Sequence, residues 1–243
     1  MTDAHARAYR NAQQRIAGLA TAGPEVPVPA TPGWSVQDLV AHLSGLAQDW
    51  IAGNLDGYAS AGWTARHVED RAAWSLAAVL EEWAGCLDAL GAVLTAPEDA
   101  GLPDPLMTAF GPVAAAAWPD IIVTDIALHE HDIRSALDAP GARDSDAVLL
   151  AMRSHVGMLR FVAGAHRLPA LLLEPSDGPR SYQIGRDTPE LTLRATLYEL
   201  FRATGGRRTR EQMAALDWSE DPGAWLDHLV MPSYGIPEDD LVE

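Results

Sequence analysis

The stretch WSVQDLVAHLSGLAQDWIAG, residues 34–53, contains the signals that start an amphipathic helix. Ser35 can cap this helix, and Asp38, three residues later, can bond back to it as in a capping box. The apolar residues that follow recur at helical spacing and are Leu39, Val40, Leu43, Leu46 and Trp50. His42 falls within this apolar face, so the pattern predicts that its side chain points toward the interior of a helical bundle.

Periodic apolar patterns predict further helices on both sides of this one. Their ranges are 3–21, the short 63–72, 75–95 and 120–137, the last started by Pro119 in its first turn. Four long helices within the first 137 residues are typical of an antiparallel four-helix bundle.

The segment DAPGARDSD, residues 138–146, is rich in turn-forming residues and marks a predicted domain boundary. Beyond it, a helix at 146–163 is followed by short β-type runs, two short helices and an irregular acidic tail. The runs are LPALLLEP, SYQIGR and ELTLRATL, and the short helices are YELFRATG and TREQMAAL. The sequence therefore predicts an α+β protein, with a helical bundle at 1–140 and a smaller α+β domain at 146–243.

Composition excludes several classes of function. The net charge of −17 would repel a phosphate backbone, so we expect no nucleic-acid partner. Without an uninterrupted apolar run of about 18 residues we expect no membrane-spanning helix. The polar N-terminus lacks the apolar segment of a signal peptide, so we expect a cytoplasmic protein. For the oligomeric state we expect a monomer or a small homo-oligomer. The single cysteine, Cys86, lies in a helical pattern without an adjoining basic residue, which favours a buried thiol over a nucleophile.

The stretch TDIALHEHDIRSAL, residues 124–137, concentrates possible metal ligands on one predicted helix. Asp125, His129 and Asp132 share a face, because residues i, i+4 and i+7 line up. Glu130 and His131 are rotated away by about 100° and 200°, so we expect them to face solvent or the second domain.

An aspartate and a histidine one turn apart can chelate one divalent ion, but zinc normally takes at least three protein ligands. His42 is the best candidate for the third ligand. Alternative interpretations remain open at this point: His42 as a hydrogen-bonded core histidine, and Asp125 as a solvated acid or one stabilised by the helix dipole. Asp132 would either orient the ring of His129 or form a buried ion pair or hydrogen bond.

Three segments, in order along the chain, resemble the mycothiol-dependent maleylpyruvate isomerase family, whose N-terminal domain is a DinB-like four-helix bundle. TPGWSVQDLVAHLSG (31–45) is similar to the opening motif of the family, W-[ST]-V-x-D-[LV]-x-x-H-[LI]. DIALHEHDIRSALDAPGARD (125–144) is similar to its later helix, E-x-x-x-H-x-x-D followed by a turn of small residues. ELFRATGGRRTREQMAALDW (199–218) resembles its C-terminal domain, including a Gly-Arg signature.

The resemblance implies a divalent metal, zinc as first choice, held by His42, Asp125 and His129 at the junction of the two domains. The family has Glu where this chain has Asp125, which is one methylene shorter but still a good oxygen ligand. It further implies mycothiol as thiol cofactor or co-substrate and a small electrophilic substrate. A metal lowers the pKa of a thiol, and the thiolate adds to a maleylpyruvate-like double bond, which rotates before elimination restores the trans alkene.

The resemblance also assigns the functional arginine of the Gly-Arg signature to Arg207, as a catalytic and cofactor-binding residue, with Arg208 beside it. Surface charge balance is the alternative for both arginines, and surface position or pocket lining for Arg66 and His67. Two further functions remain open: a thiol S-transferase that keeps the adduct, and a non-catalytic binding module on the same bundle.

Overall fold

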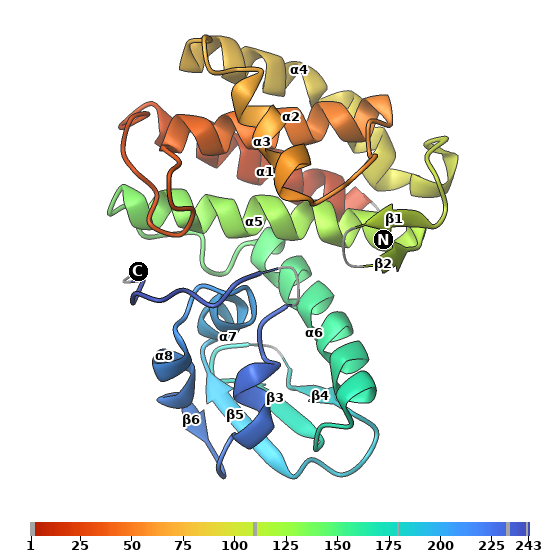
Figure 1. The fold of residues 1–243 in the computed structure, drawn as a ribbon, viewed down its shortest axis with the longest axis vertical. Helices are drawn as coiled ribbons and strands as arrows, with labels where there is room; N and C mark the ends of the chain where they lie inside the picture. Colours follow the sequence, from red (N-terminus) through yellow and green to blue (C-terminus); the bar gives the residue numbers. More distant parts are fainter. Residues whose placement is uncertain (1–2, 109–110, 179, 232–233, 242) are drawn as a thin grey trace. The chain divides into compact units, whose positions relative to one another are not determined.

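A computed structural model describes residues 3–108, 111–178, 180–231, 234–241 and 243. The chain divides into two compact units, residues 1–141 and residues 142–242. The first unit is mainly helical, and the second combines helices with a sheet (Figure 1). The predicted α+β class is therefore confirmed.

Within the described residues of the first unit, four long helices pack against one another (Figure 1). They are α1 (Asp3–Ala20), α2 (Val36–Ala52), α4 (Leu76–Thr95) and α5 (Trp118–Ala136). Helix α2 packs on α4, α1 packs on α5, and the short α3 (Ala61–Glu69) packs on α2. Between α4 and α5 lie the 3-10 turns η1 (Pro97–Asp99) and η2 (Ala115–Ala117) and a small hairpin of β1 (Leu106–Thr108) and β2 (Gly111–Val113).

Helix α2 begins as its sequence predicts. The Ser35 hydroxyl accepts a hydrogen bond from the Asp38 amide at 3.2 Å, and the Asp38 carboxylate accepts one from the Ser35 amide at 2.8 Å. The apolar residues of the predicted face are all buried: Leu39, Val40, Leu43, Leu46 and Trp50. Burying each such side chain stabilises the fold by about 1.5–3 kcal/mol, so this face anchors α2 in the bundle.

Helix α5 has Pro119 in its first turn, as predicted, and is buried on more than one face. Glu130 and His131 are 0% and 1% exposed, so the expectation is wrong where it has them face solvent. For Glu130 the reason is the packing of α1 against α5. Arg15 of α1 donates two hydrogen bonds of 2.7 Å to the Glu130 carboxylate, and Arg134 donates one of 3.0 Å.

The second unit contains a sheet with strand order β4-β3-β5-β6. The strands are β3 (Leu171–Pro175), β4 (Tyr182–Ile184), β5 (Leu191–Ala195) and β6 (Asp217–Trp218), and the helices are α6 (Asp146–His166), α7 (Leu197–Thr204) and α8 (Arg210–Ala214), with the 3-10 turn η3 (Gly223–Asp227). Strands β3 and β5 run parallel, and the other pairs are antiparallel.

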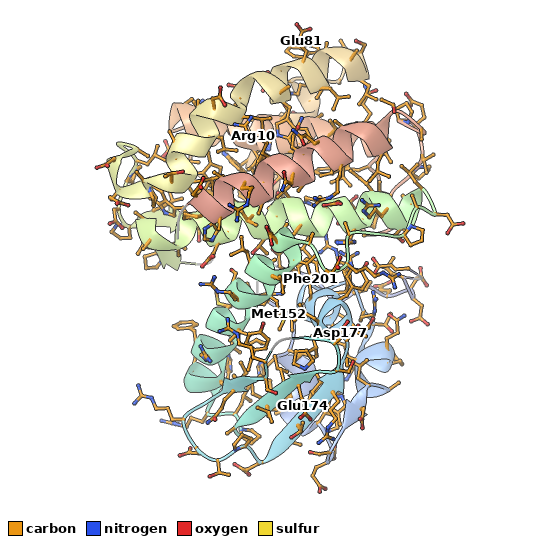
Figure 2. All side chains as sticks on the ribbon, turned by 180° about the vertical axis from the view of Figure 1, so that it is seen from behind. Arg10, Glu81, Met152, Glu174, Asp177 and Phe201 are labelled. Atoms are coloured by element: carbon orange, nitrogen blue, oxygen red, sulfur yellow. The ribbon has the colours of Figure 1, made fainter. Side chains whose placement is uncertain are left out.

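Met152 of α6 and Phe201 of α7 are buried in the core of the second unit. In the first unit, Glu81 projects from the outer surface of α4 (Figure 2).

Helix α6 is, within the described part of the chain, the one helix long and apolar enough to meet a weak criterion for crossing a membrane. More than half of its most apolar stretch is buried inside the protein. The core helix of a soluble domain has the same properties, so this helix is only weak evidence for a membrane segment.

Candidate metal centre

His42 of α2 and Asp125 and His129 of α5 converge in the first unit. One ligand atom from each lies within 4.8 Å of the other two. His42 Nε2 is 3.6 Å from Asp125 Oδ2, and His129 Nε2 is 3.6 Å from Asp125 Oδ1. The two imidazoles are buried, whereas Asp125 is partly exposed. The carboxylate thus lies between two ring nitrogens that both point toward it.

The local folding of two helices produces this arrangement. Asp125 and His129 are one turn apart on α5 and therefore share a face. His42 lies on the side of α2 that packs in the bundle, and α2 contacts α5. The His42 and His129 rings meet edge to face, with centroids 5.4 Å apart.

The donor set fits a divalent metal such as zinc. Two imidazole nitrogens and one carboxylate oxygen are the protein ligands of a known class of catalytic zinc site, which keeps a further position open. Bond lengths of about 2.0–2.2 Å place two ligand atoms of one tetrahedral zinc roughly 3.3–3.5 Å apart. The two separations of 3.6 Å between ring nitrogen and carboxylate oxygen are close to this spacing.

Asp132 fixes the tautomer of His129. Its carboxylate oxygen Oδ2 lies 3.0 Å from His129 Nδ1, and the side chain has no solvent exposure. A carboxylate only accepts hydrogen bonds, so the proton of a neutral His129 is on Nδ1 and the lone pair on Nε2. This contact agrees with both expectations for Asp132, because it is a buried hydrogen bond and it orients the ring of His129.

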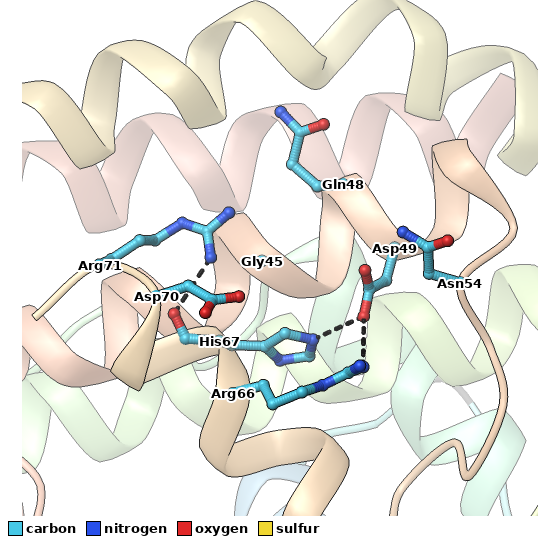
Figure 3. A pocket seen from close by; sticks show the side chains of 8 residues that line it. All are labelled: Gly45, Gln48, Asp49, Asn54, Arg66, His67, Asp70 and Arg71. Carbon is cyan, nitrogen blue, oxygen red and sulfur yellow. Dashed lines mark hydrogen bonds and ion pairs between the residues drawn. The ribbon is translucent and has the colours of Figure 1, made fainter.

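His67 of α3 is buried beside His42 rather than exposed on the surface. Its Nδ1 lies 3.1 Å from His42 Nδ1, and its Nε2 lies 3.0 Å from Asp49 Oδ2. His67, Asp49 and Arg66 also line a pocket of about 150 Å³ (Figure 3). Of the two alternatives, the structure supports pocket lining for His67, whereas Arg66 lines the pocket and is also exposed at the surface. The signal missed in the sequence is Asp49, seven residues after His42 on the same helical face.

The Gly-Arg signature lies in the second unit, directly after α7. Gly206 has φ +70°, a conformation that glycine adopts without strain. The Arg207 guanidinium stacks 5.6 Å from the Tyr234 ring centroid and donates a hydrogen bond to the Gly205 carbonyl. Arg208 binds the Glu199 carboxylate through two hydrogen bonds of 2.6 and 2.9 Å, which ties the turn to α7. The roles of Arg207 and Arg208 in binding or catalysis stay predictions.

Cys86 is a buried thiol in α4, as its sequence context indicates. Gln48 donates a hydrogen bond of 3.0 Å to its sulfur, and the thiol donates to the Glu82 carbonyl at 3.2 Å. Burial, and secondly the negative charge of Glu82, raise the pKa of this thiol above its ordinary value. A raised pKa disfavours the thiolate, so Cys86 lacks the property of a nucleophilic cysteine.

Comparison with known proteins agrees with the resemblance seen in the sequence. Residues 5–134 match the family model described as mycothiol maleylpyruvate isomerase N-terminal domain. Crystal structures of the mycothiol-dependent maleylpyruvate isomerase and of a histidine-to-alanine mutant of it are similar in fold, each with a TM-score of 0.62. Each similarity covers 91% of this chain and 94% of the other at 15% sequence identity. No curated protein matches the sequence.

An identity of 15% supports a common fold and leaves the chemistry to be argued from the site. The family match has more weight, because it spans more than half of the chain and contains all three converging residues. The suspected family is thus confirmed: the chain belongs to the family of the mycothiol maleylpyruvate isomerase N-terminal domain.

Proposed function

We propose that the protein is a metal-dependent and mycothiol-dependent enzyme that isomerises a maleylpyruvate-like unsaturated acid from cis to trans. The observation that carries the proposal is the convergence of His42, Asp125 and His129 in a member of this family. Two neutral imidazoles and one carboxylate would hold a divalent cation. The cation and its three protein ligands would together have a net charge of +1. A metal bound there lowers the pKa of a thiol, so that the thiolate is available near neutral pH.

The chain's own residues would hold and orient the reacting groups. Asp132 keeps the proton of His129 on Nδ1, away from the proposed site. By the resemblance to the family, Arg207 supplies a positive charge for the enolate oxygen of the substrate. Because Asp125 is partly exposed while both histidines are buried, the carboxylate side of the cluster is its more accessible side.

The reaction is balanced without an oxidant or a reductant. The thiolate sulfur donates an electron pair to the electron-poor C=C bond, and the π electrons move to the conjugated carbonyl oxygen. The resulting carbon–carbon single bond rotates. Collapse of the enolate re-forms the double bond in the trans geometry and expels the thiolate.

An assay of the zinc-loaded protein with mycothiol and maleylpyruvate tests this proposal. We expect the trans isomer to form only when the thiol is present, and a metal chelator to stop turnover. Accumulation of a thiol adduct instead would indicate an S-transferase. A protein that binds no metal and leaves the substrate unchanged would favour the non-catalytic binding module.

A further inference from the structure

We propose that Asp49 and His67 form a hydrogen-bonded relay that fixes the tautomer and orientation of His42, so that Nε2 of His42 presents its lone pair to the metal centre. The inference rests on the proposed function, because it deepens the account of the metal centre. Figure 3 shows the contact between Asp49 and His67. Both are positioning residues, since they act through His42.

The direction of the relay follows from what each group can donate. The Asp49 carboxylate only accepts, so the His67 nitrogen 3.0 Å away, Nε2, must carry a proton. A neutral His67 then has a bare Nδ1. That atom lies 3.1 Å from His42 Nδ1, and a contact between two ring nitrogens needs one donor. His42 therefore carries its proton on Nδ1 and its lone pair on Nε2.

The surroundings of His67 fix the position of its ring. Its imidazole is buried between α2 and Trp63, whose ring centroid is 4.3 Å away. Arg66 Nη2, which is 3.5 Å from Asp49 Oδ2, provides a positive charge next to the carboxylate at the end of the relay.

Gly45 of α2 provides the space in which the His67 ring lies. A Cβ atom at this position would be 2.7 Å from His67 Cβ and Cγ and 2.8 Å from Cδ2. Glycine inside a helix is less favourable than alanine by about 0.5–1 kcal/mol. The close approach of His67 accounts for a glycine three residues after His42, in the middle of α2.

A second set of contacts holds α3 in place. Arg71 donates to the His67 carbonyl at 3.1 Å and to the Glu82 carboxylate of α4 at 2.6 and 3.0 Å. Ser44 of α2 donates to the same carboxylate at 2.6 Å. Burial acts to raise the pKa of Glu82, but the hydrogen bonds from Arg71 and Ser44 outweigh it and hold that pKa below its usual value. The anionic Glu82 thus links α2, α3 and α4.

The relay makes the two histidine ligands equivalent in their protonation. Asp132 acts on His129 in one step, and Asp49 acts on His42 in two, through His67. In both cases a buried or partly buried carboxylate places the proton on Nδ1. The two Nε2 lone pairs then point toward Asp125, each 3.6 Å from one of its oxygens.

The test is the zinc dissociation constant, measured by competition with a chelator, for wild type, Asp49→Asn and Gly45→Ala. An asparagine amide can donate to His67 Nε2, which would reverse both tautomers and place a proton on His42 Nε2. An added methyl at Gly45 would displace the His67 ring. We expect both variants to bind zinc about 10–100-fold more weakly, as outer-shell changes generally do.

Gly85→Ala in α4 is the matched control, because a Cβ there would meet nothing within 4 Å. We expect wild-type zinc affinity for it. Nitrogen-15 NMR of the imidazoles in chelator-treated protein at pH 8 adds a readout independent of metal binding. We expect His42 as the Nδ1–H tautomer in wild type and a loss of that preference in Asp49→Asn.

Unchanged zinc affinity in a folded Asp49→Asn protein, or an Nε2–H tautomer of His42 in wild type, would overturn the relay. Failure of the proposed function looks different: wild type would then bind no zinc at all. In that case the NMR experiment would still decide whether the relay exists.

Discussion

Glu130 carries a carboxylate with no solvent exposure, and two arginines compensate its charge. Removing one partner of a buried ion pair leaves the other charge without compensation. We therefore expect Glu130→Gln to lower the free energy of unfolding by roughly 3 kcal/mol. It should leave zinc binding intact, because Glu130 is rotated about 100° from His129 around α5. Urea unfolding and elemental analysis of the same sample measure both effects.

Glu81→Gln is the control for this prediction. Glu81 is exposed on α4 (Figure 2), so its replacement should change stability by less than about 0.5 kcal/mol. Loss of zinc in a folded Glu130→Gln protein would mean that the face of α5 that binds metal has been misidentified.

The wrong expectation that Glu130 faces solvent has a physical cause. Helical geometry correctly places this residue on a different face from His129. It does not say whether that face is covered. Coverage depends on α1, more than 100 residues earlier in the chain, where Arg15 supplies the charge that makes a buried glutamate tolerable. A single polar residue in α1 gives no signal of such a distant partner.

Helix α6 of the second unit contains a histidine that the sequence reading did not use. His155 is fully buried, and its Nδ1 is 2.7 Å from the hydroxyl oxygen of Thr204. That hydroxyl donates to the Leu200 carbonyl, so Nδ1 of His155 must be the donor. Its other nitrogen, Nε2, has no hydrogen-bond partner among the described residues. Burial, and secondly the charge of Arg207, lower the pKa of His155 to about 3.

This low pKa predicts a pH dependence of stability. Between pH 6.5 and about 3, the unfolded chain binds a proton at His155 that the folded chain does not bind. The contribution of a neutral His155 to the free energy of unfolding is therefore fully present above pH 6.5. As the pH falls from 6.5 toward 3, this contribution decreases by about 1.4 kcal/mol per pH unit. Urea unfolding at several pH values, for wild type and His155→Phe, should show a shallower slope in the variant.

Val156→Ala on the same helix is the control, because truncating a buried valine should lower stability at every pH without removing the slope. Equal slopes in wild type and His155→Phe would show that His155 is not held neutral in the folded protein.

The boundaries of helices and strands show which parts of the secondary structure could be predicted from the sequence. Helices with a recognised cap, such as α2 with Ser35, begin where predicted. Helix α3 spans Ala61–Glu69 instead of 63–72, because Ser60 caps it by accepting from the Trp63 amide, a signal that was not recognised. The two-residue β6 was not predicted, since it exists only through its pairing with β5.

At the scale of the whole molecule, the three converging residues could be predicted from the sequence, but the residues that surround them could not. Helical phase and the family motif point to His42, Asp125 and His129. His67 reaches His42 because α3 packs on α2, and that packing depends on the close approach at Gly45 and on the contact of Arg71 with Glu82. These are tertiary contacts between separate helices, which periodicity within one helix does not encode.

The central claim is that His42, Asp125 and His129 bind one divalent metal, and the zinc content of purified variants tests it most directly. After dialysis against zinc and removal of the excess, wild type and Asp125→Glu should retain stoichiometric zinc. His42→Ala and His129→Ala should lose most of it, with helix content unchanged by circular dichroism. A wild-type protein without zinc, or a folded His129→Ala variant with full zinc content, would contradict the account.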